Sequence, residues 1–362
     1  MNDESYIKLA LELAKKGKGN VSPNPLVGCV IVKDNNIIGA GYHEFYGGPH
    51  AEVNAINNAK CSLEGSTLYV NLEPCVHYGK TPPCVDKIIE NKIKRVVVGV
   101  LDPNPLVSGK GVEKLKEAGI EVEVGVCREE AQFLNRFFFK SISQNIPYVT
   151  LKIAQTLDGK IADINNDSFW ISSASSRRFV HKLRSEYDAV LVGSNTVEID
   201  NPQLTVRLTE GRNPKRIIVD TKLKIELDRT IFTKDTDNII IIHSKKVNKI
   251  QKNKIRKLKE KNITLIPVRE NKDGTLNLKE ALVKLGKLKI TSILVEGGQK
   301  IFTYFVKNKL YDDIITFVSP KILGEGTSIF GNLNIKNIRR AITHKISHFE
   351  KIGDDLMIVL RR

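Results

Sequence analysis

Four residues in the first third of the chain have the types and spacing of a hydrolytic zinc site. His50 precedes Glu52 by two positions, and the thiols of Cys75 and Cys84 follow further along the chain. One imidazole and two thiolates leave the fourth tetrahedral position of Zn²⁺ for a water molecule, whose pKa the ion lowers to about 7. Glu52 could then pass protons between that water and a departing amine. We therefore predict that His50, Cys75 and Cys84 bind the metal and that Glu52 is the catalytic residue.

The two cysteines are also compatible with a purely structural role. A structural zinc site, or a pair of buried free thiols, would use the same side chains. A structural site normally completes its shell with four Cys or His ligands, and Glu52 would have no role in it. The residues also follow the His-x-Glu…Pro-Cys-x-x-Cys signature of nucleobase and nucleoside deaminases, except that eight residues, not two, separate Cys75 from Cys84. These observations favour hydrolysis of an amine.

The first half of the sequence alternates helical and strand-like segments, which must position these residues. We expect helices over 3–16, 50–59, 85–91 and 110–118, and strands over 27–32, 37–40, 67–71, 95–100 and 121–126, with Asn35-Asn36 as a hairpin turn. This alternation predicts a sheet with helices packed on its faces. Both halves of the metal site then open helices, where unpaired backbone N–H groups favour thiolate over thiol.

Length and composition predict two globular domains. The chain has 362 residues, of which 27% are charged and 41% hydrophobic, and no apolar run reaches the ~18 residues that a membrane span needs. We place the boundary at Asn145-Ile146-Pro147, which gives domains 1–146 and 147–362. The five cysteines show no paired framework, and this predicts a reducing, cytoplasmic location.

The net charge of +16 lies entirely in the second half. Residues 1–146 hold 17 basic and 17 acidic side chains, whereas residues 147–362 hold 40 and 24. The densest basic run, 245–261, has the periodicity of one helix, and its apolar stripe would be Val247, Ile250, Ile255 and Leu258. A solvated helix face accounts for this run better than a nucleic-acid site, because no aromatic residues interleave it to stack on bases.

The second half also carries a glycine turn between a strand and a helix. The strand-like run 292–295 is followed by Glu296-Gly297-Gly298-Gln299 and then by a helical stretch over 300–307. Glycines at such a turn let a phosphate approach the helix N-terminus, and a simple packing turn would use them equally well. No Gly-x-Gly-x-x-Gly fingerprint occurs, so the sequence does not support a Rossmann dinucleotide site.

Two sets of motifs, in this order along the chain, resemble the bifunctional deaminase/reductase family of riboflavin biosynthesis. The first set comprises 23–28, which reads Pro-Asn-Pro-x-Val-Gly, and 73–84. In 73–84, the segment between the two cysteines (the excursion) carries His77 and Lys80. The second set comprises 152–162, 170–172, 192–196, 200–207 and 295–298. The resemblance implies an α/β protein: a cytidine-deaminase-like three-layer α/β/α domain, followed by a dihydrofolate-reductase-like α/β domain that uses NADPH.

The resemblance also implies binding roles at the matching positions. In the deaminase half, Asn24 and His43 would orient the pyrimidine ring and Lys80 would bind the phosphate. The residues that would bind NADPH are Ala154, Trp170, Thr196, Asp200, Thr221, Gly298, Gln299, Lys300, Ile301, Phe302, Thr303 and Tyr304. The residues that would hold the substrate of the reductase half are Lys152, Ser168, Arg184, Leu204, Arg207 and Glu296. Asn201 stands where the family more often has a second aspartate, and we assign it no role.

Two consecutive reactions are implied by the same resemblance. Zinc-dependent hydrolysis would remove an amine from 2,5-diamino-6-ribosylamino-4(3H)-pyrimidinone 5′-phosphate. NADPH-dependent reduction of the ribosyl side chain would then give 5-amino-6-ribitylamino-2,4-pyrimidinedione 5′-phosphate. The expected partners are phosphorylated pyrimidines and a second copy of the chain bound through the reductase half. We expect no nucleic acid and no membrane among the partners.

Two further functions are compatible with the zinc motif. A nucleoside or tRNA adenosine deaminase with an unrelated basic RNA-binding domain would account for the zinc site and the charge. It would not account for the Thr-Pro-Pro-Cys end of the excursion or the second set of motifs. A non-catalytic zinc-binding regulator would have no use for the open ligand position. Consumption of NADPH with the deaminated pyrimidine phosphate distinguishes the predicted enzyme from both.

Overall fold

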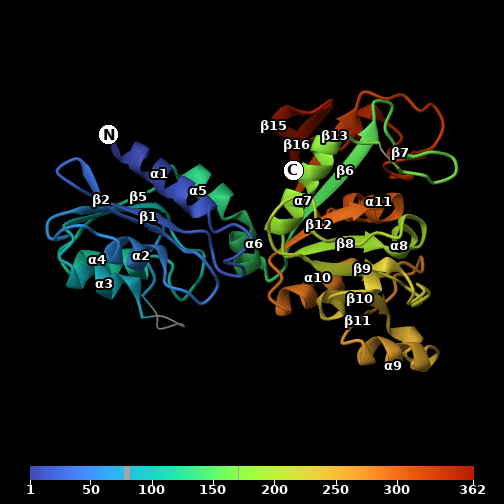
Figure 1. Ribbon diagram of the computed structural model, residues 1–362, viewed down its shortest axis with the longest axis horizontal. Helices are drawn as coiled ribbons and strands as arrows, with labels where there is room; N and C mark the ends of the chain where they lie inside the picture. The colour runs from blue at the N-terminus through green and yellow to red at the C-terminus, as the bar shows by residue number, and fades with distance from the viewer. Residues whose placement is uncertain (77–81, 170) are drawn as a thin grey trace. The chain divides into compact units, whose positions relative to one another are not determined.

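The computed structural model describes residues 1–76, 82–169 and 171–362 of the chain (Figure 1). It contains two compact units, Met1–Asn145 and Ile146–Arg362, each with its own hydrophobic core. In the described part of the chain, no helix combines the length and the apolar character of a membrane span. We describe each unit by itself.

The first unit is built on a five-stranded sheet with strand order β2-β1-β3-β4-β5. β1 pairs antiparallel with β2 and β3, whereas β3, β4 and β5 run parallel. The carboxyl ends of β3 and β4 therefore lie next to each other, at the edge where open α/β sheets bind ligands. The strands are β1 (Gly28–Lys33), β2 (Asn36–Tyr42), β3 (Thr67–Leu72), β4 (Arg95–Val100) and β5 (Glu121–Val124).

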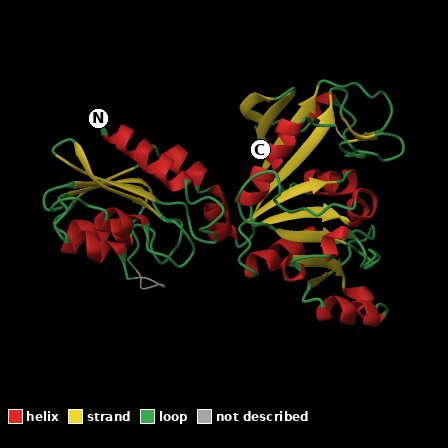
Figure 2. Ribbon diagram, viewed as in Figure 1, coloured by secondary structure: helices red, strands yellow, loops and turns green. Residues whose placement is uncertain are grey.

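Helices cover both faces of this sheet, so the first unit has the three-layer α/β/α arrangement expected from the sequence (Figures 1 and 2). The helices α1 and α5 lie on one face, and α2, α3 and α4 lie on the other (Figure 1). The central strands carry apolar residues on both faces, as strands covered on both sides do. The helices are α1 (Asp3–Lys15), α2 (Ala51–Asn57), α3 (Cys84–Glu90), α4 (Lys110–Glu117), α5 (Arg128–Leu134) and α6 (Arg136–Gln144).

The hairpin between β1 and β2 turns one residue earlier than the sequence pattern suggested. Lys33 pairs with Asn36, and the two residues between them, Asp34 and Asn35, have φ angles of 49° and 62°. A two-residue hairpin of this kind needs φ above zero at both central positions, and Asp and Asn tolerate that conformation. Asn36 is therefore already the first residue of β2.

The second unit contains a nine-stranded sheet with strand order β11-β10-β9-β8-β12-β6-β13-β16-β15. The strands from β11 to β13 are parallel, and β16 and β15 add an antiparallel edge. A small second sheet pairs β7 (Lys160–Ala162) with β14 (Thr327–Ser328). The main strands are β6 (Tyr148–Thr156), β8 (Ala189–Gly193), β9 (Lys215–Val219), β10 (Ile239–Ser244), β11 (Thr264–Val268), β12 (Ser292–Gly297), β13 (Asp313–Ser319), β15 (Lys345–Ile352) and β16 (Asp355–Arg361).

Side-chain alternation along the strands divides this sheet into two faces. Odd-numbered residues of β6 and β12, such as Leu151 and Val295, join the apolar core together with residues of α10 and α11. Even-numbered residues face the other way, where the Tyr187 hydroxyl at the end of α7 contacts Thr150 at 2.8 Å. The helices of this unit are α7 (Ala174–Glu186), α8 (Ser194–Asp200), α9 (Lys252–Glu260), α10 (Leu278–Lys287) and α11 (Gln299–Lys307), with 3₁₀ turns η1 (Thr230–Phe232), η2 (Thr236–Asn238), η3 (Lys245–Lys249) and η4 (Ile338–Arg340).

The lysine-rich run 245–261 is not one helix, contrary to the sequence prediction. It forms the short turn η3 and then the separate helix α9. Ser244 caps the short turn by accepting a hydrogen bond from the backbone N–H of Lys246, and the turn ends at Lys249, before α9 begins at Lys252. Val247 and Leu258 are buried, whereas Ile250, at the break, is 77% exposed. The apolar stripe drawn from the sequence is therefore interrupted.

Candidate active sites

Three metal-binding side chains converge at the carboxyl edge of the first sheet. His50 is the N-cap of α2, Cys75 follows β3, and Cys84 is the first residue of α3. The His50 Nδ1 atom lies 3.2 Å from Cys84 Sγ and 3.5 Å from Cys75 Sγ. All three donor atoms lie within 4.8 Å of one another, and in the described part of the chain no other group of three such donors does so.

The donor set and its spacing fit a zinc ion. Zn–S bonds of about 2.3 Å and Zn–N bonds of about 2.0 Å place neighbouring donors of a tetrahedron about 3.5 Å apart. The observed separations of 3.2 and 3.5 Å match that edge. The backbone N–H of Cys84, at the start of a helix, also donates to Cys75 Sγ at 3.4 Å, which favours a thiolate there. The site therefore offers one imidazole and two sulfurs of the kind that hydrolytic zinc prefers.

The two thiols differ in acidity. Hydrogen bonds from Cys84 and His50 lower the pKa of Cys75 to about 4, although burial opposes the shift. The pKa of Cys84 is raised, chiefly by its hydrogen bond to Cys75 and by burial. Loss of a proton is therefore favoured at Cys75 and opposed at Cys84.

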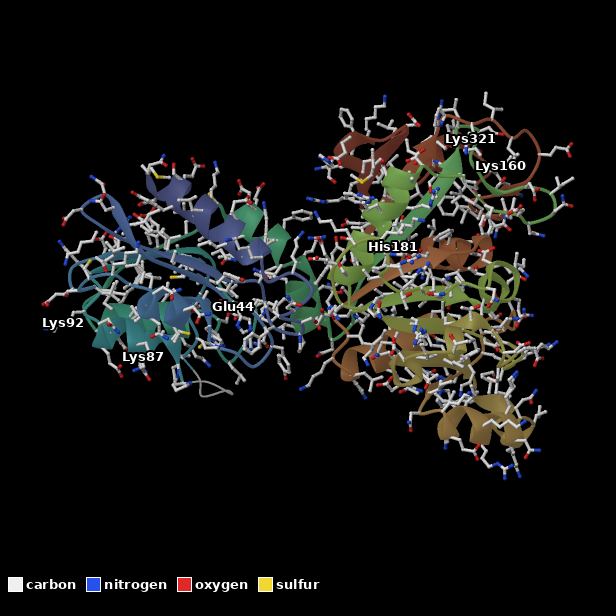
Figure 3. All side chains as sticks on the ribbon, in the orientation of Figure 1. Glu44, Lys87, Lys92, Lys160, His181 and Lys321 are labelled. Carbon is white, nitrogen blue, oxygen red and sulfur yellow. The ribbon has the colours of Figure 1, made fainter. Side chains whose placement is uncertain are left out.

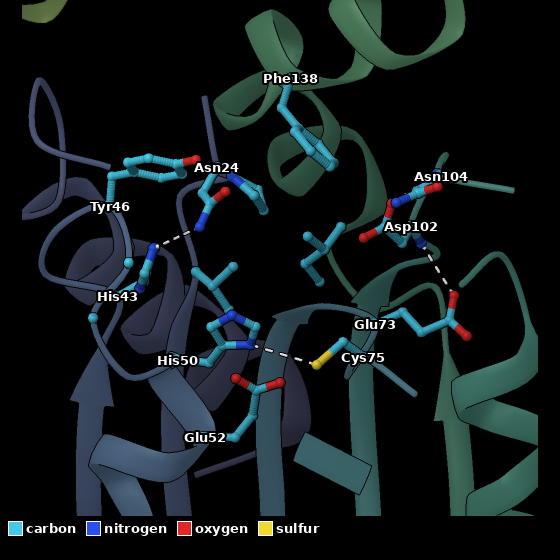
Figure 4. Close-up of a pocket in the computed structure, with 15 residues that line it drawn as sticks. Asn24, His43, Tyr46, His50, Glu52, Glu73, Cys75, Asp102, Asn104 and Phe138 are labelled. Carbon is cyan, nitrogen blue, oxygen red and sulfur yellow. Dashed lines mark hydrogen bonds between the residues drawn. The ribbon is translucent and has the colours of Figure 1, made fainter. Parts of the chain in front are cut away.

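Glu52 lies in the first turn of α2, beside His50 and Cys75 (Figure 4). Its side chain is buried, and burial raises the pKa of this carboxyl to about 7, against the opposing effect of His50. A carboxyl that titrates near neutrality can both take up and release a proton at working pH. The position and the acidity of Glu52 suit the proton transfer predicted from the sequence.

Asn24 and His43 line the same pocket and contact each other (Figure 4). His43 Nδ1 lies 2.9 Å from the carbonyl oxygen of Pro49, so this nitrogen carries the proton. His43 Nε2 then accepts from the Asn24 amide nitrogen, 3.2 Å away. Burial lowers the pKa of His43, which keeps the ring neutral. Lys80, the third predicted contact, lies outside the described residues.

Several residues of this pocket were not predicted from the sequence. Asp102 and Asn104 enter it from the loop after β4, and Tyr46 and Phe138 form parts of its wall (Figure 4). Burial raises the pKa of Asp102 to about 6. A usable signal was present, because Asp102 follows the buried strand 95–100 at the parallel sheet edge that also carries Cys75.

A second cavity lies on the even-numbered face of the second sheet, beside α7. Strand alternation places Lys152 and Ala154 of β6 and Glu296 of β12 on this face. All six residues predicted to hold the reductase substrate line the cavity: Lys152, Ser168, Arg184, Leu204, Arg207 and Glu296. Residues from motifs far apart in the sequence thus meet in one place.

A buried ion pair organises this cavity. Arg184 donates from Nε and Nη2 to the two carboxylate oxygens of Glu296, at 2.6 and 2.8 Å, and from Nη1 to the Thr205 carbonyl. Burial alone would raise the pKa of Glu296, but Arg184 and then Lys152 hold it below the ordinary value. Burial lowers the pKa of Lys152. Arg184 is thus paired with a carboxylate of the protein. Arg207 instead donates from Nη1 to a neutral group, Thr205 Oγ1.

Only some of the residues predicted to bind NADPH line this cavity. Ala154, Thr196, Asp200, Gly298 and Phe302 do so, and a Cβ on Gly298 would lie 3.4 Å from Thr196 Oγ1, so the glycine turn packs closely on α8. The Tyr304 hydroxyl instead contacts Asn271 and the backbone of Leu278. The cavity lining also does not include Thr221, Gln299, Lys300, Ile301 and Thr303. Trp170 lies outside the described residues.

His181, on α7, is a cavity residue that was not predicted from the sequence (Figure 3). Its Nδ1 accepts hydrogen bonds from the backbone N–H groups of Arg207 and Leu208, at 2.8 and 3.3 Å. Burial, followed by Arg184 and Arg207, lowers its pKa to about 4. The ring is therefore neutral and fixes the loop that carries Leu204 and Arg207. Its place three residues before Arg184, nearly one helical turn, was the available signal.

Asn201, left without a role, caps α8 and does not line the cavity. It has a φ of 42° and its side chain accepts from the backbone N–H of Thr230 at 2.7 Å. Asparagine tolerates this left-handed conformation better than most residues. Its function in the structure is to end α8 and hold the chain near η1.

Comparisons with known proteins cover both halves. Residues 147–358 match the model of the RibD C-terminal domain, and residues 1–100 match that of the cytidine and deoxycytidylate deaminase zinc-binding region. The riboflavin biosynthesis protein RibD of Aquifex aeolicus is 51% identical over 361 residues, which cover 99% of this chain and 98% of that protein. RibD of Escherichia coli is 37% identical over 374 residues, 99% of each. The match to the C-terminal domain accounts for the region that an unrelated RNA-binding domain would have occupied.

Solved structures agree over the full length. Acinetobacter baumannii RibD is similar with a TM-score of 0.90 at 35% identity, covering 99% of this chain and 98% of that one. A diaminohydroxyphosphoribosylaminopyrimidine deaminase/5-amino-6-(5-phosphoribosylamino)uracil reductase from Thermotoga maritima has a TM-score of 0.87 at 41% identity, with the same coverage. The fold class predicted from the sequence is confirmed. The chain therefore belongs to the RibD family of riboflavin biosynthesis proteins, and it is a bifunctional enzyme whose deaminase half uses zinc and whose reductase half uses NADPH.

Proposed function

We propose that residues 1–146 deaminate 2,5-diamino-6-ribosylamino-4(3H)-pyrimidinone 5′-phosphate and that residues 147–362 reduce the ribosyl side chain of the product. The final product is 5-amino-6-ribitylamino-2,4-pyrimidinedione 5′-phosphate. The observation that carries the first assignment is the meeting of the donor atoms of His50, Cys75 and Cys84, next to a pocket that the buried Glu52 lines. The name of the similar Thermotoga protein supports the pairing of both reactions.

In the deaminase half, His50, Cys75 and Cys84 hold the metal and Glu52 moves the protons. Zinc bound there would supply a Lewis acid that lowers the pKa of a water molecule, so that hydroxide becomes available to attack the ring. Glu52 would accept the proton of the water and deliver it to the departing amine, which would leave as ammonia. Burial raises the pKa of this carboxyl to about 7, which favours the return of an accepted proton to the leaving group.

The walls of the pocket orient the pyrimidine. Asn24 and His43 form a fixed neutral pair, held through the Pro49 carbonyl, and we assign them the ring edge opposite the reacting carbon. Lys80 is assigned to the substrate phosphate. The lowered pKa of His43 leaves its ring without a positive charge, so recognition on this side depends on hydrogen bonds.

In the reductase half, the cavity beside α7 holds the deaminated substrate and the nicotinamide. NADPH supplies the hydride that reduces C1′ of the ring-opened sugar. Lys152, Asp200 and Glu296 are the polar groups assigned to the surroundings of that carbon, and Arg207, which is less buried than Arg184, is assigned to the phosphate. Ser168, Leu204 and Arg184 complete the substrate side.

The proposed NADPH contacts are those implied by the resemblance. Five of them have the additional support that they line the cavity: Ala154, Thr196, Asp200, Gly298 and Phe302. The full set is Ala154, Trp170, Thr196, Asp200, Thr221, Gly298, Gln299, Lys300, Ile301, Phe302, Thr303 and Tyr304.

We also propose that the enzyme acts as a homo-oligomer, through the reductase half, in the cytoplasm. The edge strand β15 supports the first point, because Ile346 and Phe349 are 64% and 69% exposed there. An exposed apolar edge strand normally pairs or is covered. The five cysteines, none of which forms a disulfide, support a reducing compartment.

The direct test uses the zinc-loaded full-length protein and the diamino pyrimidine phosphate. Without NADPH, one ammonia should be released per substrate and the ribosyl product should accumulate. Addition of NADPH should then consume one equivalent and give the ribityl product. Ammonia release without any NADPH consumption would contradict the second assignment, and NADPH consumption with supplied deaminated substrate but no ammonia release would contradict the first.

A further inference from the structure

The carboxylate of Glu73 has an unusual set of partners. Glu73 follows β3, two residues before the ligand Cys75, and is 4% exposed. Its Oε2 accepts from the backbone N–H of Asp102 at 3.1 Å (Figure 4). The same oxygen accepts from the backbone N–H of Gly109 at 2.9 Å. Its Oε1 accepts from those of Gly111 and Val112, at 2.9 and 3.3 Å. One side chain thus binds four backbone donors from a distant segment of the chain.

Two of these four N–H groups, those of Asp102 and Gly109, belong to the two ends of one loop. The other two, those of Gly111 and Val112, belong to the first turn of a helix. The loop runs from the end of β4 to Gly109, and α4 begins at Lys110. Gly109, the N-cap of α4, has a φ of 88° and supplies no capping side chain. The first N–H groups of a helix need acceptors, and a negative charge near them is favourable. Glu73 therefore caps α4 from another element of the fold.

The loop held in this way carries the pocket residues Asp102 and Asn104. Asp102 Oδ1 accepts from the backbone N–H of Asn104 at 2.7 Å, and Asn104 Oδ1 accepts from that of Leu106 at 3.1 Å. Each bond fixes the next part of the loop, and the series starts where Glu73 binds the Asp102 N–H. The orientation of both side chains toward the pocket thus depends on Glu73.

Packing at Gly111 ties the same segment to the metal ligand. A Cβ on Gly111 would lie 2.3 Å from the Pro74 carbonyl oxygen and 3.0 Å from Glu73 Oε1. A real Cβ cannot come so close, so only glycine lets α4 approach the residues that precede Cys75. The start of α4 and the Glu73-Pro74-Cys75 segment therefore share one rigid contact.

We propose that Glu73 is a positioning residue of the deaminase, which holds the Asp102–Asn104 loop against the substrate in register with Cys75. The proposal rests on the proposed deaminase function. The four hydrogen bonds of the Glu73 carboxylate all go to backbone N–H groups of the loop and of α4. Its effect on the reaction therefore passes through the loop.

The test compares Glu73→Gln with Glu113→Gln in the full-length zinc enzyme. The glutamine keeps one acceptor oxygen but presents an N–H₂ group to two backbone donors, whereas Glu113 is an exposed acid of the same helix. For Glu73→Gln we expect unchanged zinc content, unchanged reductase activity and a deaminase kcat/KM lower by roughly 30- to 300-fold, mostly through KM. Glu113→Gln should match the parent in all three.

Two further variants separate positioning from folding. Glu73→Asp keeps the negative charge, so its KM should lie between that of the parent and that of Glu73→Gln. Asn104→Ala alone should lower the deaminase kcat/KM by about as much as Asn104→Ala combined with Glu73→Gln. The two effects are not additive if Glu73 acts through the loop that carries Asn104. Loss of zinc from Glu73→Gln and Glu73→Asp, additive effects with Asn104→Ala, or a Glu73→Gln enzyme equal to Glu113→Gln would each overturn the proposal. Failure of the parent enzyme to deaminate would instead contradict the proposed function.

Discussion

Residue types and their spacing in the first half predicted a zinc site that hydrolyses an amine. An imidazole, two thiols and a neighbouring carboxylate have few other uses together, and the structure brings their side chains into one place. What the types could not show is the acidity of each group, because burial and neighbours set it. The raised pKa of Glu52 and the lowered pKa of Cys75 follow from the fold and not from the motif.

Replacing Glu52 by Gln should separate metal binding from turnover. The amide keeps the shape of the side chain but cannot take a proton, so deamination should fall by roughly 10²- to 10⁴-fold. Zinc content, measured by atomic emission, should stay at one ion per chain, and NADPH consumption with the deaminated substrate should be normal. Removing zinc from the parent with a chelator should likewise abolish deamination and leave reduction intact. If the Gln variant lost its zinc, Glu52 would have a ligand-supporting role instead.

Arg184 and Glu296 form a second test at the level of single residues. Arg184→Ala would leave a buried carboxylate without its partner, which costs about 3 kcal/mol of stability. In the parent, the lowered pKa of Glu296 contributes stability above pH ~4.5 that is lost as the pH falls through the folded value. Without Arg184, burial raises that pKa, so the deficit of the variant should shrink on acidification. Denaturant titrations at pH 8 and pH 5 measure both values.

The control for this experiment is Arg256→Ala. Arg256 pairs with Glu260 on α9, where both side chains are more than half exposed, so its loss should change stability by no more than ~1 kcal/mol at either pH. An equal loss in both variants would show that the buried pair has no special role.

At the level of elements, the sequence predicted that His50 and Cys84 lie at the starts of two helices. It did not predict which strands lie next to each other. The periodicity placed the starts of α2 and α3 within one residue, and so the positions of His50 and Cys84. Asp102, Asn104 and His181 were missed because their importance comes from neighbours in space. The prediction of a single helix over 245–261 was wrong for a related reason, since Ser244 caps a short turn that periodicity does not reveal.

His181 should matter for the loop that it holds and not for proton transfer. His181→Ala removes the acceptor of two backbone N–H groups, so KM for the pyrimidine phosphate in the reductase reaction should rise about tenfold. Because its pKa is about 4, the effect should be constant from pH ~5.5 to pH ~8. Lys182→Ala, on the exposed side of the same helix, is the matched control. A pH-dependent effect within that range would contradict the neutral, positioning role.

At the level of the whole molecule, each unit places its site at one face or edge of its own sheet. The carboxyl ends of β3 and β4 carry the deaminase residues, and strand alternation on β6 and β12 brings the reductase residues together. The pairing order of the nine strands in the second sheet has no signature in the sequence.

The edge strand β15 offers a test of assembly. Phe349→Asp places a charge on an exposed apolar edge, so an oligomer that uses this edge should dissociate to monomers in light scattering. Ile250→Asp, at the break before α9 where the side chain is even more exposed, should leave the mass unchanged. An oligomer that survives Phe349→Asp would have to use another surface.

The three metal ligands belong to three different elements, since His50 precedes α2, Cys75 follows β3 and Cys84 begins α3. One ion held by all three would therefore join these elements, and its binding free energy would add to the stability of the first unit. Loading the protein with zinc should thus raise the melting temperature of the deaminase unit in calorimetry and leave that of the reductase unit unchanged. The ion that serves the chemistry would also act as a cross-link of the fold.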